Sequence, residues 1–396
     1  MTLEEQLATL RRGTAAIISE EDLKRKLAKG TPLNVKLGVD PTAKHVTLGW
    51  AVVLRKLRDF QRLGHQAILI IGDFTALIGD PSGKSKTRKQ LSREEVQANV
   101  DAVLEQVHRI LDREKTTIVF NKDWLGKMQF EDVIRLCSRY TVARILERDD
   151  FTKRLAENRP IAMHEILYPL CQGMDSVEIV ADVEIGGNDQ LFNCLVGRTL
   201  MEQYGQEPQV VITCPLLVGT DGVEKMSQSL GNYISVVDTP REMFGKTMSI
   251  PDDIILNYFE LATDFPMDEA RALLAEGRNP RDAKVALAKE IVALYHSRQA
   301  ADEEERYFVE TFSKKQQPVE AEEAAIPAEA IEEGMVNVPA MVVALGLAKS
   351  NGAAKDLLKS GAVALDGEKV SDFRLSLDAA RGKVLRVGKH QFRKLQ

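Results

Sequence analysis

The 396-residue sequence has few cysteines, no long apolar run and no overall excess of positive charge. None of the four cysteines is spaced as C-x-x-C, so we expect reduced, mostly buried thiols in a cytoplasmic protein. No run reaches the roughly 18 apolar residues of a membrane span, and the charged N-terminus lacks a signal-peptide core. The formal net charge of −6 excludes a surface that binds nucleic acid as a whole, although a local basic patch is compatible with it.

The first half of the chain alternates short apolar runs with helical stretches. Helical periodicity is found over 1–27, 48–63 and 92–112. The runs that we interpret as strands are 34–39, 67–74, 116–121, 177–186 and 210–213. Strands interleaved with helices indicate a parallel α/β sheet.

The composition changes after residue 238. Residues 239–315 have apolar positions three and four apart, which predicts helices, and Thr239 with Pro240 forms a typical helix start. Residues 316–334 contain six glutamates, two prolines and no Lys or Arg, so we interpret them as an acidic linker. From Val336 to Gln396 there are eleven Lys and Arg against five Asp and Glu. A basic module indicates an anionic polymer as partner, or simply a solvated basic surface.

Two polar loops could hold phosphate. The stretch GDPSGKSKTRK (79–89) resembles a P-loop, but its glycines enclose three residues where a P-loop needs four. Its cations can still form an anion clamp, or only an exposed basic loop. The stretch GTDGVEKMSQSLGN (219–232) brings Lys225, Ser227 and Ser229 into a glycine-flanked loop that could close over a triphosphate. Taken alone, it is an ordinary polar loop.

Two further stretches could line a pocket. In EIGGNDQLFN (184–193), glycines end a strand and Asp189 follows, which suits a ribose but equally suits a helix cap. In HEILYPLCQGMDSVEIV (164–180), Tyr168, Gln172 and Asp175 fall on one helix face. That face either lines a site for a small polar ligand or is exposed. Upstream, GVDPT is a strand end and turn before a helix start, which is a natural phosphate site.

In order, the stretches GVDPTAKHVTLGW, GDPSGK, YPLCQGMD, GGNDQ and KMSQS resemble the motifs of bacterial tyrosyl-tRNA synthetases of class I. Residues 340–372 resemble the S4 RNA-binding module that ends these enzymes, so the resemblance covers nearly the whole chain. It implies a Rossmann-like parallel-sheet catalytic domain over 1–238, with a helical dimerisation insertion around 125–165. It further implies an α-helical anticodon-side domain over 239–315, the linker, and a small α+β S4-like domain over 335–396.

The resemblance implies a tyrosine–tRNA ligase that uses tyrosine, ATP with Mg²⁺ and tRNA(Tyr), without a protein metal site, and that forms a homodimer. The tyrosine ligands would be Asp80, Tyr168, Gln172, Asp175 and Gln190. The ATP ligands would be Gly38, Asp40, Gly49, Trp50, Gly187, Asp189 and Gln228. The catalytic donors on the pyrophosphate side would be Thr42, Thr47, Lys84, Arg88, Lys225 and Ser229. The tRNA ligands would include Lys349, Lys355, Lys359, Arg386, Arg393 and Lys394.

Four positions depart from the family pattern. Thr47 and Trp50 stand where the family has two histidines, and Gln228 replaces the second lysine of the loop. Lys36 stands where many relatives have a tyrosine that contacts the substrate hydroxyl. We expect Thr47 and Trp50, with help from Lys44 or His45, to replace the missing donors. The competing hypothesis is a synthetase-like protein that binds tyrosine, nucleotide or RNA but aminoacylates weakly or not at all.

Overall fold

The computed structural model describes residues 1–82, 92–313, 322–332, 334–370, 372–388 and 391–396. The chain forms two compact units, Met1–Ala301 and Asp302–Gln396. No helix within the described residues is long and apolar enough to cross a membrane.

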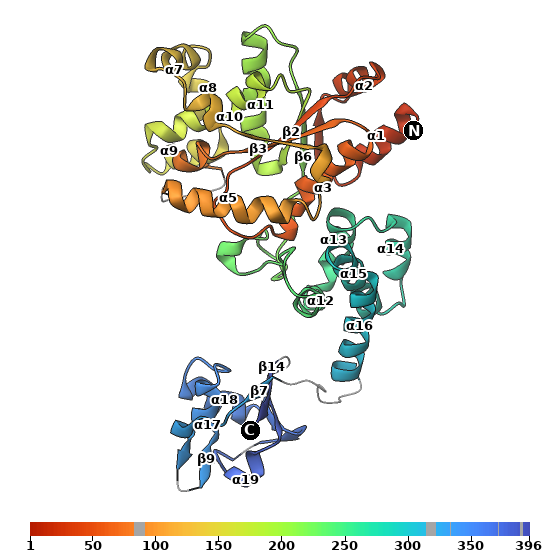
Figure 1. The fold of residues 1–396 in the computed structure, drawn as a ribbon, viewed down its shortest axis with the longest axis vertical. Helices are drawn as coiled ribbons and strands as arrows, with labels where there is room; N and C mark the ends of the chain where they lie inside the picture. Colours follow the sequence, from red (N-terminus) through yellow and green to blue (C-terminus); the bar gives the residue numbers. More distant parts are fainter. Residues whose placement is uncertain (83–91, 314–321, 333, 371, 389–390) are drawn as a thin grey trace. The chain divides into compact units, whose positions relative to one another are not determined.

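A six-stranded sheet forms the centre of the first unit (Figure 1). In spatial order its strands are β1 (Ala16–Ile18), β6 (Val210–Cys214), β5 (Val183–Gly187), β2 (Asn34–Val39), β3 (Gln66–Ile71) and β4 (Thr116–Phe120). All neighbouring strands are parallel except β1, which runs antiparallel to β6. The predicted parallel α/β sheet is therefore confirmed.

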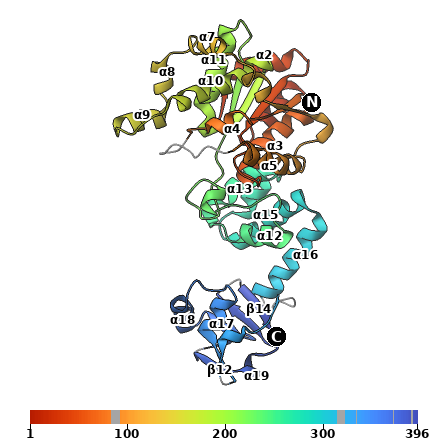
Figure 2. The ribbon, with the colours of Figure 1, turned by 60° about the vertical axis from the view of Figure 1, so that its left-hand side comes forward.

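Helices cover both faces of this sheet, as its apolar strands require. Helices α3 (Leu48–Arg62) and α5 (Arg93–Val107) lie on one face, and α10 (Met163–Glu178) and α11 (Leu191–Gln203) on the other (Figures 1 and 2). The chain moves from β2 outward to β3 and β4, then returns to place β5 on the other side of β2. The strand order thus reverses between β2 and β5, and in open α/β sheets ligands bind at the carboxyl ends of strands at this point.

Four of the predicted elements differ from the structure in extent. The strand predicted over 67–74 ends at Ile71, and the helix predicted over 92–112 ends at Val107. The N-terminal segment is not continuously helical, because β1 interrupts it between α1 (Leu3–Arg11) and α2 (Glu20–Ala28). Three residues are too few to show strand alternation, and only pairing with β6 defines them. The strand expected over 177–186 begins at Val183, because α10 continues to Glu178. An apolar turn with Val180 at φ 48° separates the two, and it contains no glycine or proline that would reveal it in the sequence.

Four short helices are inserted between β4 and α10, in the region expected to hold the dimerisation insertion. They are α6 (Lys122–Leu125), α7 (Phe130–Cys137), α8 (Val142–Leu146) and α9 (Asp149–Ala156). They share one hydrophobic cluster with α10 and α11, in which Leu136, Ile145 and Phe151 are buried. The insertion is thereby fixed to the same helix that carries Tyr168, Gln172 and Asp175.

Helices fill the described part of the region predicted to be helical after residue 238, and one further short helix was not predicted. A short α4 (Thr75–Ile78) follows β3, and α12 (Pro240–Met248) begins the helical region with Thr239 as its N-cap, as predicted. The chain continues through α13 (Ile255–Ala262), α14 (Met267–Leu273), α15 (Pro280–Tyr295) and α16 (Arg298–Phe308).

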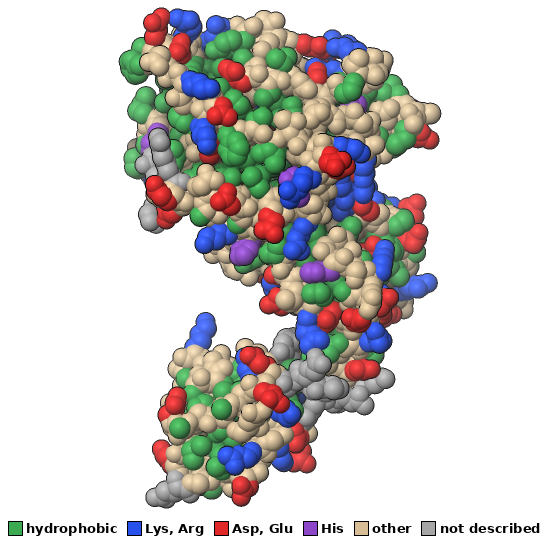
Figure 3. Space-filling model, in the orientation of Figure 1, with side chains coloured by type: hydrophobic (Ala, Val, Ile, Leu, Met, Phe, Trp, Pro, Cys, Tyr) green, Lys and Arg blue, Asp and Glu red, His purple; other side chains and the backbone are tan. Residues whose placement is uncertain are grey.

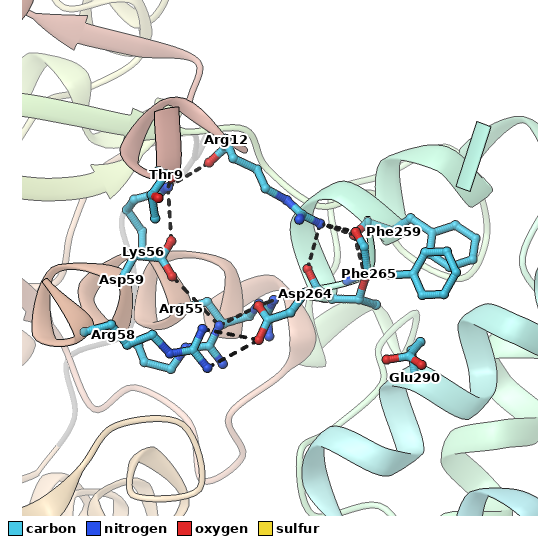
Figure 4. Close-up of polar contacts among 12 residues, drawn as sticks. Thr9, Arg12, Arg55, Lys56, Arg58, Asp59, Phe259, Asp264, Phe265 and Glu290 are labelled. Carbon is cyan, nitrogen blue, oxygen red and sulfur yellow. Dashed lines mark hydrogen bonds and ion pairs between the residues drawn. The ribbon is translucent and has the colours of Figure 1, made fainter. Parts of the chain in front are cut away.

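A polar junction joins this helical region to α1 and α3 (Figure 4). Asp264, just after α13, accepts from Arg55 at 2.5 Å and from Arg58 at 2.7 Å, both on α3. Arg12 donates to three carbonyls at the end of α13, and Lys56 donates to three at the end of α1. Cations at helix C-termini satisfy unpaired carbonyls and complement the helix dipoles, so this junction holds the helices in place.

The second unit contains two small sheets. Their orders are β11-β10-β13-β14-β7 and β12-β9-β8. The strands are β7 (Glu323–Ala324), β8 (Ile331–Glu332), β9 (Met335–Asn337), β10 (Val363–Leu365), β11 (Glu368–Lys369), β12 (Arg374–Ser376), β13 (Val384–Val387) and β14 (Gln391–Leu395). The helices are α17 (Val338–Ala344), α18 (Asn351–Lys359) and α19 (Leu377–Ala380).

The acidic segment interpreted as a linker over 316–334 is therefore part of this unit from residue 322 onward. Strand β7 pairs in parallel with β14, and Glu323 forms an ion pair with Lys394 at 3.1 Å. Composition suggested a linker because glutamates and prolines dominate it, but Glu322 and Glu323 pair with basic residues of β14, and the apolar Ile326 and Ala330 enter the core of the unit.

Candidate active site

A cavity of about 520 Å³ opens at the carboxyl ends of β2 and β5. All of the residues expected to bind tyrosine or ATP line it, as do the expected catalytic donors other than Lys84 and Arg88. Those two residues lie within 83–91, outside the residues that the structure describes. Elements far apart in the sequence thus meet at one cavity, which the individual motifs could not establish.

Asp40 anchors one wall of the cavity. Its carboxylate accepts from the Tyr168 hydroxyl at 2.9 Å and from Thr75 Oγ1 at 2.7 Å. Gly72 makes this contact possible, because a Cβ there would lie 2.0 Å from Asp40 Oδ1. Burial, together with Asp40 and Asp80, raises the pKa of Tyr168 well above its ordinary value, so the phenol remains a neutral donor. Sequence reasoning missed Thr75 and Gly72, which follow β3 and carry no motif of their own.

A second polar group surrounds Asp80. Gln190 Nε2 donates to Asp80 Oδ2 at 2.8 Å, and Asn193 Nδ2 donates to Gln190 Oε1 at 3.0 Å. The buried Arg148 guanidinium lies 3.7 Å from Asp80 and donates to Ser82 Oγ at 2.8 Å. Because Arg148 precedes α9, the helical insertion supports the cavity wall, which nothing in the sequence had signalled.

Asp175 lines the cavity and is 4% exposed. Its Oδ1 accepts from Trp124 Nε1 at 2.9 Å, and its Oδ2 accepts from Asn121 Nδ2 at 3.5 Å. Burial raises the pKa of Asp175 to about 7, against the opposing effects of Lys36, Trp124 and Asn121. A buried carboxylate that lines a cavity is a suitable acceptor for a substrate hydroxyl.

The turn before α3 is built around Thr47. Thr47 is the N-cap of α3, and its Oγ1 accepts from the Trp50 N–H at 3.3 Å. Thr47, Gly49 and Trp50 all line the cavity, whereas Lys44 and His45 are exposed and do not. The expected help from the Lys44 or His45 side chains is therefore not seen in this structure. The N-terminus of α3 still directs backbone N–H groups toward a phosphate position.

The loop 219–232 lies against this turn. Gln228 Nε2 donates to the His45 carbonyl at 2.6 Å, and the Gly49 N–H approaches Met226 Sδ at 3.3 Å. Lys225 of this loop forms an ion pair at 2.8 Å with Asp189, which follows β5. Asn232 packs closely against Gly219 in this loop. A Cβ at Gly219 would lie 2.2 Å from the side-chain amide nitrogen of Asn232, so no larger residue fits there. Phosphate-side donors and the predicted ribose ligand are thus within direct reach of one another.

Such a cavity, lined by a lysine-bearing loop at the point where a parallel sheet reverses its strand order, is typical of the nucleotide-binding sites of Rossmann-type enzymes. The family model "tRNA synthetases class I (W and Y)" matches residues 28–313, and the chain belongs to that family.

Curated relatives are similar over nearly the whole chain. Tyrosine–tRNA ligase of Carboxydothermus hydrogenoformans is 54% identical, over 99% of this chain and 98% of that protein. The tyrosine–tRNA ligases of Moorella thermoacetica and Thermotoga maritima are 53% and 49% identical, over 98% and 99% of this chain and 95% and 97% of theirs.

The fold also matches solved structures. A tyrosyl-tRNA synthetase from Archaeoglobus fulgidus, crystallised with L-tyrosine, superposes with a TM-score of 0.64 at 23% identity. The match covers 76% of this chain and 99% of that one, and it supports the fold alone.

Proposed function

We propose that this cavity joins L-tyrosine to ATP as tyrosyl-adenylate and that the chain then transfers tyrosine to the 3′ end of tRNA(Tyr). The chain is thus a tyrosine–tRNA ligase, the activity carried by the names of its relatives. The observation that carries the proposal is Asp175, a buried carboxylate in the same cavity that the expected phosphate donors Thr42, Thr47 and Lys225 line.

The tyrosine site is assigned from the polarity of its walls. The phenolic hydroxyl donates to Asp175, and the ammonium group lies among Asp80, the Tyr168 hydroxyl and Gln172. Acceptors at both ends suit a ligand with a hydroxyl at one end and a cation at the other. The Gln190 amide, already fixed on Asp80, lies near the substrate carboxyl.

The first reaction needs no nucleophile from the protein. The tyrosine carboxylate attacks the α-phosphate of ATP and pyrophosphate leaves, so the protein contributes positioning and stabilisation of charge. Gly38 and the Asp40 backbone border the α-phosphate, and Gly187 and Asp189 bind the ribose. Thr42, Thr47, Lys225 and Ser229 stabilise the departing pyrophosphate. When ATP binds, Lys225 exchanges Asp189 for phosphate oxygens. ATP brings Mg²⁺ with it as part of the substrate complex.

The tRNA site is assigned to the second unit. Lys349, Lys355 and Lys359 are exposed on or beside α18 and available to phosphates. Arg386 lies on β13, while Arg393 and Lys394 on β14 form ion pairs with Glu322 and Glu323 at 3.2 and 3.1 Å. We therefore assign the stronger phosphate contacts to the α18 lysines, as part of an S4-like RNA-binding module.

A homodimer is assigned through the helical insertion. Large hydrophobic side chains are unusually exposed on or beside α7, α8, α9 and the start of α10. They are Phe130 (79%), Ile134 (55%), Val142 (57%), Leu155 (49%) and Met163 (72%). Figure 3 shows hydrophobic surface over this region of the first unit. Such a patch is typical of a protein interface, and Ile134→Glu should convert the dimer to a monomer in light scattering.

Tyrosine-dependent exchange of pyrophosphate into ATP tests the proposal. The wild-type chain should catalyse exchange with L-tyrosine, and the rate with L-phenylalanine should be far lower. Binding of tyrosine or ATP without exchange would replace the ligase with the synthetase-like binding protein considered above.

A further inference from the structure

Beneath the tyrosine site lies a buried ion pair that the reaction itself does not use. Lys36 on β2 and Glu184 on β5 are 0% and 2% exposed, and Lys36 Nζ lies 3.0 Å from Glu184 Oε1. Their strands are neighbours at the switch point of the sheet. Taking two charges out of water is costly, and a charged pair in such a place is weak support for stability. Its function must therefore be sought in its contacts.

Both members of the pair hold Gln172. The side-chain Nε2 of Gln172 donates to Glu184 Oε1 at 3.1 Å, and Lys36 Nζ donates to the backbone carbonyl of Gln172 at 3.3 Å. A carboxylate only accepts hydrogen bonds, so it fixes the amide with its nitrogen inward. Gln172 Oε1 is then left as the acceptor for the substrate ammonium. Without the negative charge of Glu184, the amide could turn and present N–H groups to that cation.

Glu184 is saturated by its other neighbours. Its Oε2 accepts from Ser176 Oγ at 3.4 Å and from the Gln209 amide. Gly197 leaves the space for this group, because a Cβ there would lie 2.9 Å from both Ser176 Oγ and Gln209 Nε2. Four donors on one carboxylate hold Glu184 in place.

The pair also acts on Asp175, one helical turn beyond Gln172. The charged groups that face Asp175 are Lys36 from β2 and Glu184 from β5, and Lys36 lowers the pKa of Asp175 more than Glu184 raises it. Tyr168 and Cys171 from α10 also face Asp175, but burial raises the pKa of the Cys171 thiol to about 12 and that of Tyr168 well above its usual value. Both stay neutral at physiological pH, so Lys36 and Glu184 are the charged neighbours that modify the effect of burial on the pKa of Asp175.

We infer that Lys36 and Glu184 are positioning residues for tyrosine recognition: Glu184 turns the Gln172 oxygen toward the ammonium, and Lys36 holds both Glu184 and the Gln172 backbone carbonyl in place. The inference rests on the proposed tyrosine site and explains how a lysine can stand where many relatives have a tyrosine. The inference gives the Lys36–Glu184 pair a role that depends on its charge, whereas the simpler alternative is that these side chains only pack in the core.

The test uses the full chain and three variants: Lys36→Met, Glu184→Gln and the double variant. Tyrosine binding is measured by calorimetry without ATP between pH 5.5 and 8.5, and KM values for tyrosine and ATP are measured by pyrophosphate exchange. Lys26→Met is the matched control, because Lys26 is 1% exposed and paired with Asp182 at 2.8 Å but lies on α2 and does not line the cavity.

Opposite pH shifts are the expected result. Wild-type tyrosine binding should strengthen as pH rises through about 7. In Lys36→Met this rise should move to higher pH by about one unit, and in Glu184→Gln it should move to lower pH. Both variants should weaken tyrosine binding about tenfold, leave KM for ATP unchanged and reduce discrimination against phenylalanine. Lys26→Met should match the wild type in each measurement.

Unchanged pH dependence and unchanged tyrosine KM in folded variants would overturn the inference. If Lys36→Met does not fold, the nearly isosteric Glu184→Gln decides alone, because Gln209 has an unpaired Oε1 that can turn to accept from the new amide. Absence of tyrosine binding by the wild type would instead refute the proposed function, and the two failures are thereby distinguished.

Discussion

At the scale of single residues, the cavity depends on side chains whose charge is set by burial. Asp175 is the strongest case, since its carboxyl is buried among Trp124, Asn121 and Lys36 and its pKa rises to about 7. Asp40 differs, because the Tyr168 and Thr75 hydroxyls bind it directly and Gly72 leaves the space for it. The two carboxylates therefore differ in role: Asp40 fixes the cavity wall, whereas Asp175 is the proposed acceptor of the substrate hydroxyl.

Asp175 should make the free protein less stable as pH rises. The folded state holds the Asp175 proton to a pKa of about 7, whereas the unfolded chain releases it at the ordinary aspartate pKa of 3.8. Between these values the folded state binds more protons, so the contribution of Asp175 to stability falls with rising pH. Asp175→Asn removes this pH-dependent contribution, because an asparagine side chain does not titrate. The difference in melting temperature between Asp175→Asn and wild type should therefore grow in favour of the variant from pH 4.5 to pH 8; a constant difference would contradict the assignment.

Thr47 has a structural role as an N-cap and a proposed role as a phosphate donor. Measuring both stability and kinetics in one variant should distinguish them. Thr47→Ala removes the N-cap of α3 and should cost about 1 kcal/mol of folding stability. It also removes a donor at the pyrophosphate and should cost about 1–3 kcal/mol of transition-state stabilisation in kcat/KM. Thr47→Ser keeps the hydroxyl and should restore most of both losses. Wild-type exchange kinetics in a destabilised Thr47→Ala would leave Thr47 with a structural role alone.

At the scale of elements, the ends of β2 and β3 and the start of α3 build the nucleotide side of the cavity. These ends are glycine-rich because chain and ligand both need room there. Gly38 has open space around the position of a Cβ, whereas a Cβ at Gly72 would collide with Asp40 and Thr75. One glycine therefore leaves room for a ligand and the other for the protein itself.

A pair of alanine variants distinguishes these roles. Gly38→Ala should fold with an unchanged melting temperature and raise KM for ATP, because the new methyl group occupies space that the nucleotide needs. Gly72→Ala should lower the melting temperature by several degrees, because Asp40 must move. Thermal unfolding followed by circular dichroism, with exchange kinetics on the soluble variants, checks both. Equal melting temperatures in the two variants would argue against this division.

At the scale of the whole molecule, the chain divides into the units Met1–Ala301 and Asp302–Gln396, and the proposed chemistry divides with it. Every described residue assigned to tyrosine or ATP lies in the first unit. The residues assigned to tRNA lie in the second, which has its own core around Val336, Met341 and Leu385. Each unit should therefore keep its own activity.

Truncation after Ser313 should separate the two reactions. The shortened chain should retain tyrosine-dependent pyrophosphate exchange within about twofold of wild type and lose most tRNA charging, because phosphate contacts supply much of the affinity for RNA. Filter binding of tRNA at two salt concentrations provides the control, since the salt dependence should decrease together with the affinity. A folded truncation that has lost exchange as well would show that the second unit supports the chemistry.

The sequence by itself determined the strands β2, β3, β4 and β6 and the helix start at Thr239, and its family resemblance named the expected tyrosine and ATP ligands that line the cavity. Buried parallel strands are apolar throughout, and the functional motifs stand directly after them, so both are visible locally. Tertiary structure alone decided β1, the true start of β5 and the place of residues 322–332 in the second unit, because pairing partners far along the chain define these segments. It also decided the contacts of Thr75, Trp124, Arg148 and Glu184. These side chains belong to no local motif, and only folding brings them to the carboxylates and amides of the cavity.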